Sequence, residues 1–357
     1  MALPICSPSP RLDRFGQAME SLYGSFSSID DPTEWTPPPR SGGHRGRYLW
    51  TDAFGVVNFL TMHSEYRRTG NDTIGDDRYL ILAARLIETV HDVLGKTRDG
   101  RSRLRGATDT NPLSGGLRIG KTDAHGPDGD GQYHHYLTVW MFALNRMAKA
   151  SGDVKYNRQA AELAKAIHPR FFVDRAAARP RMIWKMSMDL SEPMVKSEGN
   201  LDPIDGFVIF RLLQATAMEA GDGAVLTEEI EDYRRTMERK GEHFVSSDPL
   251  DLDNLFEINQ YLERNIRFRL AFREFGTCMG IQCQSEVNAE KERSVDLKCY
   301  SDAIIAAWDP YMQLSISDDL TPVDLRPITR VMYASALIPG AFQAGFLGQE
   351  PTPTLWK

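Results

Sequence analysis

Apolar residues recur at helical spacing along most of the chain after Arg47, and they define two kinds of helix. Residues 53–62 (AFGVVNFLTM) and 207–218 (FVIFRLLQATAM) are apolar almost all round, which is typical of helices buried on two sides. Residues 227–240 keep a single apolar stripe, which predicts a helix with one face in water. This alternation predicts an all-α protein, in which an inner ring of helices is covered by an outer ring.

Glycine-containing turns mark the ends of three predicted helices, which run over residues 48–68, 132–150 and 202–220. Each is followed by a glycine, at positions 70, 152 and 221. Glycine just past a helix end adopts the left-handed conformation at little cost, so it is the expected stop signal. The repeated punctuation indicates a repeated helical hairpin. Further helices are predicted over residues 255–275, 295–312 and 325–342.

The chain divides into an arm and a helical body. Residues 1–46 are rich in Pro, Ser, Gly and Asp and predict an extended N-terminal arm, so residues 47–357 are expected to form a single domain. The loops over 95–131 and 168–202, which lead into buried helices, are long. Long structured loops at one end of a scaffold usually carry binding and chemistry, so the starts of the buried helices should share one mouth.

Charge and composition exclude several classes of partner. The 42 Lys and Arg against 49 Asp and Glu give a net charge of −7, which argues against a nucleic-acid partner. No run approaches the roughly 18–20 apolar residues of a membrane span, and the first residues lack the apolar core of a signal peptide. We therefore expect a cytoplasmic protein with no membrane partner.

The cysteines are too sparse for a disulfide framework, and no CxxC pair indicates zinc. Cys6 stands alone, whereas Cys278 and Cys283 lie close in sequence, with Cys299 beyond them. Structural thiols are the expected interpretation, and a soft-metal or redox site is the alternative. With no HExxH or comparable pattern, we predict neither a metal site nor a cofactor.

Polar clusters open the three buried helices. Trp50 and Asp52 begin the first, residues 130–135 (DGQYHH) the second, and Asp202 and Asp205 the third. Acidic residues at these positions commonly cap the helix, and we assign that role to Asp202, which is followed by Pro203. Carboxylates, an indole and paired imidazoles at one mouth could also perform acid and base chemistry on a hydroxylated substrate.

The segment from Asp130, DGQYHHYLTVWMFALNRMAKASGDVKYNRQAAELAKA, resembles the helix pair of unsaturated glucuronyl hydrolases and related six-hairpin glycosidases. The resemblance implies an (α/α)6 toroid, with Asp130 as the catalytic acid/base. The family's continuation after Asp-Gly is replaced here by Gln132, Tyr133, His134 and His135. N-acylglucosamine 2-epimerases share the same toroid and work with histidines, so the resemblance also allows an isomerase.

The two histidines cannot point the same way, because adjacent residues lie about 100° apart around a helix. Neither lies on the main apolar stripe, so at least one of His134 and His135 should reach the mouth or solvent. A hydrogen-bonded structural histidine is the alternative for either.

Two loops supply candidate substrate contacts, in addition to Trp50, Gln132 and Tyr133. The loop over 115–121 is rich in glycine and carries Arg118 and Lys121, which could hold a substrate carboxylate or phosphate; the alternative is a surface turn. The loop over 182–189 alternates apolar and polar residues. There Trp184 could line a pocket, with Lys185 and Asp189 projecting into it.

Three functions remain open. The first is a hydrolase of a small acidic sugar, with Asp130 as acid/base, Asp52 or Asp205 as second carboxylate, and Arg118 or Lys121 on the substrate's negative group. The second is a cofactor-independent isomerase, epimerase or cyclase with His134 or His135 as base. The third is a non-catalytic helical-repeat scaffold that binds a ligand or a partner. The expected substrate is a small molecule, anionic or polyhydroxylated; its identity and the oligomeric state stay open.

Overall fold

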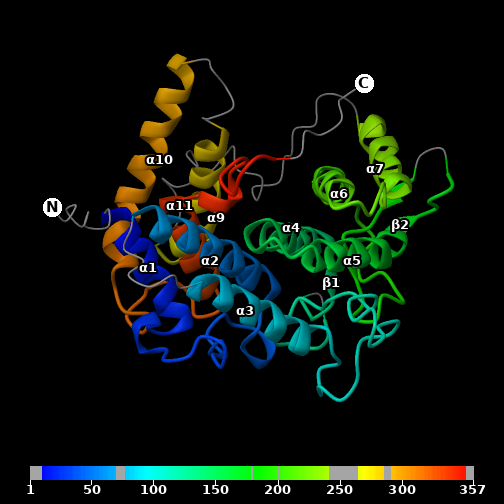
Figure 1. Cartoon of the computed structure of the whole chain (residues 1–357), viewed down its shortest axis with the longest axis horizontal. Helices are drawn as coiled ribbons and strands as arrows, with labels where there is room; N and C mark the ends of the chain where they lie inside the picture. The colour runs from blue at the N-terminus through cyan, green and yellow to red at the C-terminus, as the bar shows by residue number, and fades with distance from the viewer. Residues whose placement is uncertain are drawn as a thin grey trace. The chain divides into compact units, whose positions relative to one another are not determined.

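The computed structural model describes residues 10–69, 77–126, 128–177, 180–199, 201–240, 264–284 and 291–350. In this part the chain is mostly helical, with ten α-helices and four two-residue strands (Figure 1). The helices are α1 (Pro10–Tyr23), α2 (Leu49–Thr69), α3 (Arg78–Leu94), α4 (His134–Ser151), α5 (Lys155–Phe171), α6 (Asp202–Glu219), α7 (Thr227–Lys240), α9 (Arg264–Gln284), α10 (Lys291–Met312) and α11 (Arg326–Leu337). The all-α prediction is confirmed at this level.

Most predicted helices lie within a few residues of their expected bounds. Helix α7 coincides with the prediction, and α2, α4 and α6 begin or end one or two residues away from it. Gly152 and Gly221 adopt the left-handed conformation after α4 and α6, with φ of 71° and 84°. Gly70 lies outside the described residues, as does 255–263, the first part of the helix predicted to end at residue 275.

The extended arm predicted for residues 1–46 is wrong over Pro10–Tyr23, which forms α1. Its buried residues recur at helical spacing: Leu12, Phe15, Gly16, Ala18, Met19, Leu22 and Tyr23. This stripe packs α1 against α11. The surrounding Pro- and Ser-rich composition favoured an extended arm over a helix. Local composition also carries no information about which distant helix will cover an apolar face.

The chain splits into two compact units. Unit 1 comprises Met1–Gly42, Phe54–Arg85 and Ser247–Leu347, and unit 2 comprises Gly43–Ala53, Leu86–Ser246 and Gly348–Lys357. Helices α2 and α3 contribute residues to both. The single toroid domain expected over 47–357 stays a prediction.

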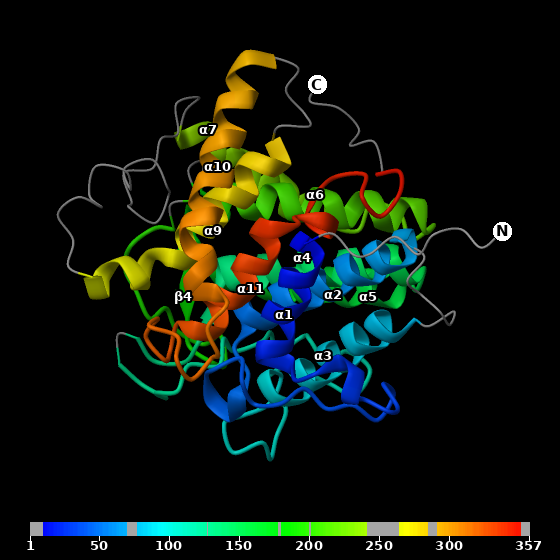
Figure 2. The same cartoon turned by 90° about the vertical axis from the view of Figure 1, so that its left-hand side faces the viewer.

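Unit 1 is built around α11, which is buried along almost its whole length. Helices α1 and α9 pack against it, and α10 packs against α9 (Figure 2). The buried Arg330 of α11 forms an ion pair with Asp319 at 2.8 Å and donates to the carbonyls of Met312 and Leu314. These bonds fasten the loop after α10 to the core helix.

Unit 2 contains two packed helical pairs, α4 with α5 and α6 with α7, and α4 also packs against α6 (Figure 1). Strand β1 (Gln132–Tyr133) pairs antiparallel with β4 (Lys185–Met186), so that Tyr133 faces Lys185 across the ladder. Strands β2 (Phe172–Val173) and β3 (Arg181–Met182) form a second pair. The β1–β4 ladder joins the two long loops, over residues 95–131 and 168–202, in which the sequence analysis predicted binding and chemistry.

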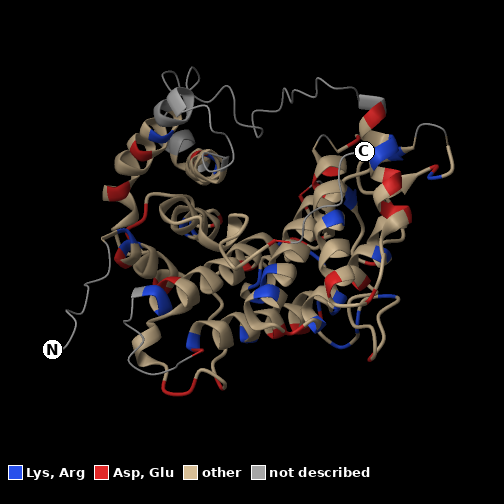
Figure 3. Cartoon of the chain, turned by 45° about the horizontal axis from the view of Figure 1, so that its top comes forward, with Lys and Arg blue, Asp and Glu red and all other residues tan. Residues whose placement is uncertain are grey.

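Basic and acidic residues are interspersed along the described helices (Figure 3). Helix α7 illustrates this arrangement, because Arg234 forms ion pairs with Glu231 and Glu238 on the exposed face of the helix. In the part of the chain that the structure describes, no helix combines the length and apolar character that crossing a membrane requires.

A half-buried histidine makes the stability of unit 2 depend on pH. His91 Nε2 accepts the indole N–H of Trp140 at 3.1 Å, and burial lowers its pKa to about 4. The unfolded chain binds this proton near pH 6.5, so stability is lost as the pH falls from about 6.5 to about 4. We expect His91→Gln, whose side-chain oxygen can still accept the indole proton, to remove about 1–3 kcal/mol of this loss.

Urea denaturation at several pH values between 4 and 7.5 measures this difference. The wild-type curve should fall below the H91Q curve toward acid pH, so that the two separate, if the imidazole is the source. Parallel pH profiles for the two proteins would assign the acid sensitivity to other groups.

Candidate functional site

The loops that precede α4 are tied to the buried carboxylate of Asp130. Its Oδ2 accepts hydrogen bonds from the guanidinium groups of Arg98 and Arg118, each at 2.8 Å. Its Oδ1 lies 2.9–3.2 Å from three backbone N–H donors, those of Gly120, Lys121 and Gly131. Asp130 is 1% exposed. Five donors occupy all the lone-pair positions of a carboxylate, so its geometry is that of a group that organises loops.

Arg118 belongs to the same network. The side chain is fully buried, and besides Asp130 it binds the carbonyl oxygens of Lys96 and Val93 at 2.9 Å. Burial lowers its pKa and the Asp130 carboxylate opposes that change. Its fork of donors is directed at protein acceptors, so this geometry favours loop attachment over the predicted role of a substrate clamp. Lys121 donates its backbone N–H to Asp130, and Lys121 as a whole is partly exposed.

Gln132 also acts within the protein. Its Oε1 accepts the N–H of Leu117 at 3.0 Å, and its Nε2 donates to the carbonyls of Gly115 and Met188. A Cβ at Gly116, which has φ of 74°, would lie 1.8 Å from Gln132 Oε1. Only glycine fits there, so the glycine-rich sequence serves this close approach. Asp189 is exposed and accepts hydrogen bonds from neighbouring Ser187 and Ser191, which closes a turn.

The other two predicted carboxylates lie at the starts of α2 and α6. Asp52 is fully buried, and its Oδ1 lies 3.5 Å from the guanidinium of the equally buried Arg47. Asp205 occupies the first turn of α6 and is partly exposed.

Two histidines converge on one carboxylate that sequence reasoning assigned to a helix cap. Asp202 Oδ1 lies 3.4 Å from His134 Nδ1 and 3.5 Å from His135 Nδ1. Asp202 is 6% exposed and is the first residue of α6, whose N-cap is Leu201, so the predicted N-cap lies one residue too late. These distances are slightly longer than hydrogen bonds, and such contacts in ligand-free sites commonly tighten when a ligand binds.

The protonation of this cluster follows from its burial. Burial alone would raise the pKa of Asp202, but the two imidazoles lower it below its ordinary value. Burial lowers the pKa of His134, while Asp202 opposes that change. Near neutral pH the cluster therefore contains the Asp202 carboxylate and the neutral, buried imidazole of His134. The more exposed imidazole of His135 faces the same carboxylate.

His135 is the accessible member, with 33% of its side chain exposed. Aromatic rings surround it, with centroids 4.9 Å away for Tyr136, 6.0 Å for Trp50, 6.1 Å for Tyr133 and 6.3 Å for Trp184. These residues come from α2, β1, α4 and the β3–β4 connection. The structure thus brings together Trp50, Tyr133, His135 and Trp184, each of which the sequence analysis named as a candidate site residue.

Two hydroxyls and an ammonium group lie beside this ring of aromatics. The hydroxyls of Tyr48 and Tyr136 form a hydrogen bond, and burial raises the pKa of Tyr136 well above its ordinary value, so it stays protonated. Lys185 Nζ lies 4.8 Å from the centre of the Tyr133 ring. Burial lowers the pKa of this lysine, while Asp128 acts in the opposite direction.

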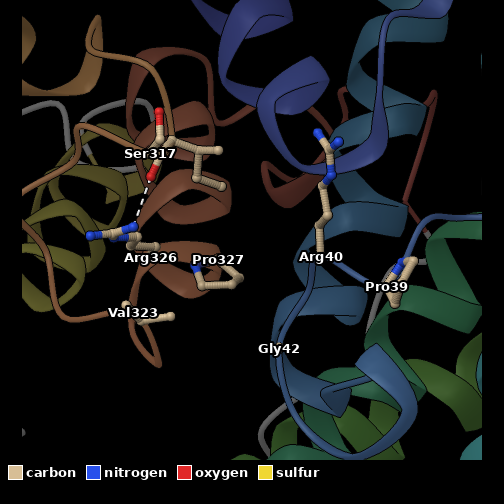
Figure 4. A pocket seen from close by; sticks show the side chains of 8 residues that line it. Pro39, Arg40, Gly42, Ser317, Val323, Arg326 and Pro327 are labelled. Atoms are coloured by element: carbon tan, nitrogen blue, oxygen red, sulfur yellow. Dashed lines mark hydrogen bonds between the residues drawn. The ribbon is translucent and has the colours of Figure 1, made fainter.

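Unit 1 has a pocket of a different kind, about 460 Å³ in volume (Figure 4). It is lined by Pro39, Arg40, Gly42, Ile316, Ser317, Val323, Arg326 and Pro327. The guanidinium of Arg326 donates to the carbonyls of Thr321 and Ile316 and so maintains the wall. This lining offers no imidazole or carboxylate for proton transfer, so the aromatic site in unit 2 is the better catalytic candidate.

Metal ligands do not gather in the residues that the structure describes, where no three His, Cys, Asp or Glu side chains could hold an ion together. Cys278 is buried in α9, where burial raises its pKa to about 11, and Cys299 is exposed on α10. Comparison of the chain with family models, with curated proteins and with solved structures finds no match.

Proposed function

We propose that this protein is an enzyme that transfers protons on a small organic molecule without a cofactor, as an isomerase, epimerase or cyclase does. His135 is the proton-transfer base in this proposal. The observation that carries it is the placement of a partly exposed imidazole whose Nδ1 faces the buried Asp202 carboxylate at 3.5 Å. A carboxylate in that position fixes the tautomer of a catalytic histidine and stabilises its protonated form.

The chemistry follows from the groups around the imidazole. With the proton of its neutral form on Nδ1, facing Asp202, His135 offers Nε2 to remove a proton from the substrate, such as one on a carbon next to a carbonyl. The hydrogen-bonded Tyr48 and Tyr136 supply protonated hydroxyls nearby, which can donate to the oxygen that gains charge. One base and one donor are sufficient for enolisation followed by return of the proton at another position.

The aromatic residues around His135 support a substrate with a flat or ring-shaped face. Trp50 and Trp184 have partly exposed side chains, and indole rings bind both sugar faces and conjugated systems. This agrees with a polyhydroxylated ring compound as the expected ligand.

The hydrolase hypothesis has weaker geometric support. It requires Asp130 to give a proton to a leaving group, whereas five hydrogen bonds occupy this buried carboxylate. The histidine-based reaction needs no such rearrangement.

The ring of helical hairpins belongs to the same proposal. Helix α11 pairs with α1, and α4 pairs with α5. In each pair the first helix is buried over most of its length and the second buries a single stripe. Pairs of this kind support an inner and an outer layer, as in an (α/α)6 toroid.

Deuterium exchange tests the reaction class even though the substrate is unidentified. A pool of sugars, sugar acids and conjugated ketones is incubated in D₂O with wild type or with His135→Gln, and analysed by mass spectrometry. We expect wild type to place solvent deuterium in a substrate, or in an isomer of the same formula. We expect no such incorporation with H135Q, since glutamine cannot act as the base.

His125→Gln provides a matched control, because His125 is exposed in a loop of the same unit. It should behave as wild type. A product heavier by one water that H135Q forms at the wild-type rate would replace this proposal with the hydrolase hypothesis.

A further inference from the structure

Tyr233 of α7 reaches the histidine cluster by passing over Gly206 of α6, where no side chain blocks its ring. Its hydroxyl lies 2.7 Å from His134 Nε2, and both side chains are fully buried. The ring passes close to Gly206 of α6, where an added Cβ would lie 2.3–2.7 Å from three ring atoms of Tyr233. Glycine at this position allows a residue of α7 to reach an imidazole at the start of α4.

The direction of this hydrogen bond follows from where the phenol proton can go, since His134 Nε2 is the one acceptor that the Tyr233 hydroxyl contacts in the described part of the chain. Tyr233 packs against the rings of His168, Phe172 and Phe210, with centroids 5.0–5.3 Å apart. This surrounding raises the pKa of Tyr233 well above its ordinary value, so the phenol keeps its proton. A neutral His134 then accepts at Nε2 and carries its own proton on Nδ1, the atom 3.4 Å from Asp202.

We propose that Tyr233 is a positioning residue, whose hydroxyl fixes His134 as the Nδ1–H tautomer and thereby directs that proton at Asp202. The inference rests on the proposed function, since its purpose is to hold the carboxylate that faces His135. His134 in the other tautomer would present a lone pair to the carboxylate and repel it. The chain Tyr233, His134, Asp202, His135 thus has one consistent set of donors and acceptors.

The experiment reads the tautomer directly. Protein labelled with ¹⁵N in histidine is compared by long-range proton–nitrogen correlation spectra for wild type and Tyr233→Phe, with the His134 signals assigned by a His134→Gln variant. We expect His134 to be protonated on Nδ1 in wild type and to become a mixture of the two tautomers in Y233F, where Asp202 alone still favours Nδ1. The phenylalanine ring keeps the packing, so the loss of one hydroxyl is the only chemical change.

Tyr156→Phe is the matched control, because Tyr156 is a buried tyrosine of the same unit whose ring contacts the ammonium group of Lys155. It should leave the His134 signals as in wild type. His134 protonated on Nε2 in wild type, or on Nδ1 in both wild type and Y233F, would overturn the inference.

A second variant acts on the same bond from α6. In Gly206→Ala the new Cβ displaces the Tyr233 ring, so the His134 tautomer should change as in Y233F. Wild-type spectra for G206A would show that the contact between Tyr233 and His134 does not require glycine at position 206.

Activity separates this inference from the proposed function. Once a substrate is found by deuterium exchange, we expect Y233F to lower kcat about tenfold, the lower end of the range for residues that orient metal-bound histidines, with little change in KM because Tyr233 is fully buried. A changed tautomer with unchanged kcat would refute the positioning role. If Y233F changes the His134 tautomer but H135Q still exchanges deuterium, the hydrogen-bond chain stands and the proposed function is refuted.

Discussion

Replacement of Asp130 by alanine is expected to lower the free energy of unfolding by about 3–5 kcal/mol, because it leaves buried cations without their counter-charge. Arg118 is fully buried and the side chain of Arg98 is 20% exposed, and both donate to the same carboxylate oxygen. Three backbone N–H groups lose their acceptor at the same time. Each unsatisfied buried donor adds to the cost.

Urea denaturation followed by tryptophan fluorescence measures this loss. Asp128→Ala is a suitable control, since Asp128 is exposed two residues earlier in the same loop. A catalytic acid/base at position 130 predicts the opposite pattern, in which turnover disappears while stability is retained. Equal midpoints for D130A and D128A would therefore restore the hydrolase hypothesis.

Helices of unit 2 could be predicted from the sequence because the signals that define them are local. Apolar periodicity and the glycines at 152 and 221 fix α4 and α6 within a residue or two, without reference to any partner. Helix α1 has an equally clear stripe, from Leu12 to Tyr23, but the surrounding composition favours an arm. The periodicity alone is the better guide there.

The site could be predicted only in part, because pairings between distant segments decide its chemistry. The two loops join through the pairing of Tyr133 with Lys185, and nothing in either segment alone specifies the other. Asp202, followed by Pro203, has the sequence of a helix cap, yet its carboxylate faces two histidines of α4. Asp130 shows the converse, since a motif that resembles a catalytic one holds loops together.

The aromatic residues of the site could be predicted from the sequence because each lies in a segment that the helix pattern marks as a helix start or a long loop. Trp50, Tyr133 and Trp184 each lie at or just before a predicted helix start or within a long loop, and the structure gathers them around His135. Tyr233 belongs by its spacing to the apolar stripe of an outer helix. Its hydroxyl could not be placed without the spatial relation of α7 to α4.

Neutralising Asp202 is expected to lower turnover strongly without removing the base itself. In Asp202→Asn the carboxylate that orients His135 is replaced by an amide, whose nitrogen can donate to Nδ1 and select the wrong tautomer. The protonated imidazole also loses its counter-charge. We expect the rate of deuterium exchange to fall by about 10²–10⁴-fold, the range associated with loss of a positioned general base.

The rate is measured with the substrate identified for wild type, and folding is checked by the urea midpoint. Asp222→Asn is the control, because Asp222 is an exposed carboxylate of the same unit that pairs with Arg158. It removes the same charge far from the imidazoles and should exchange deuterium as wild type does. If D202N kept the wild-type rate with an unchanged midpoint, His135 would not depend on this carboxylate, and the base would have to be sought elsewhere.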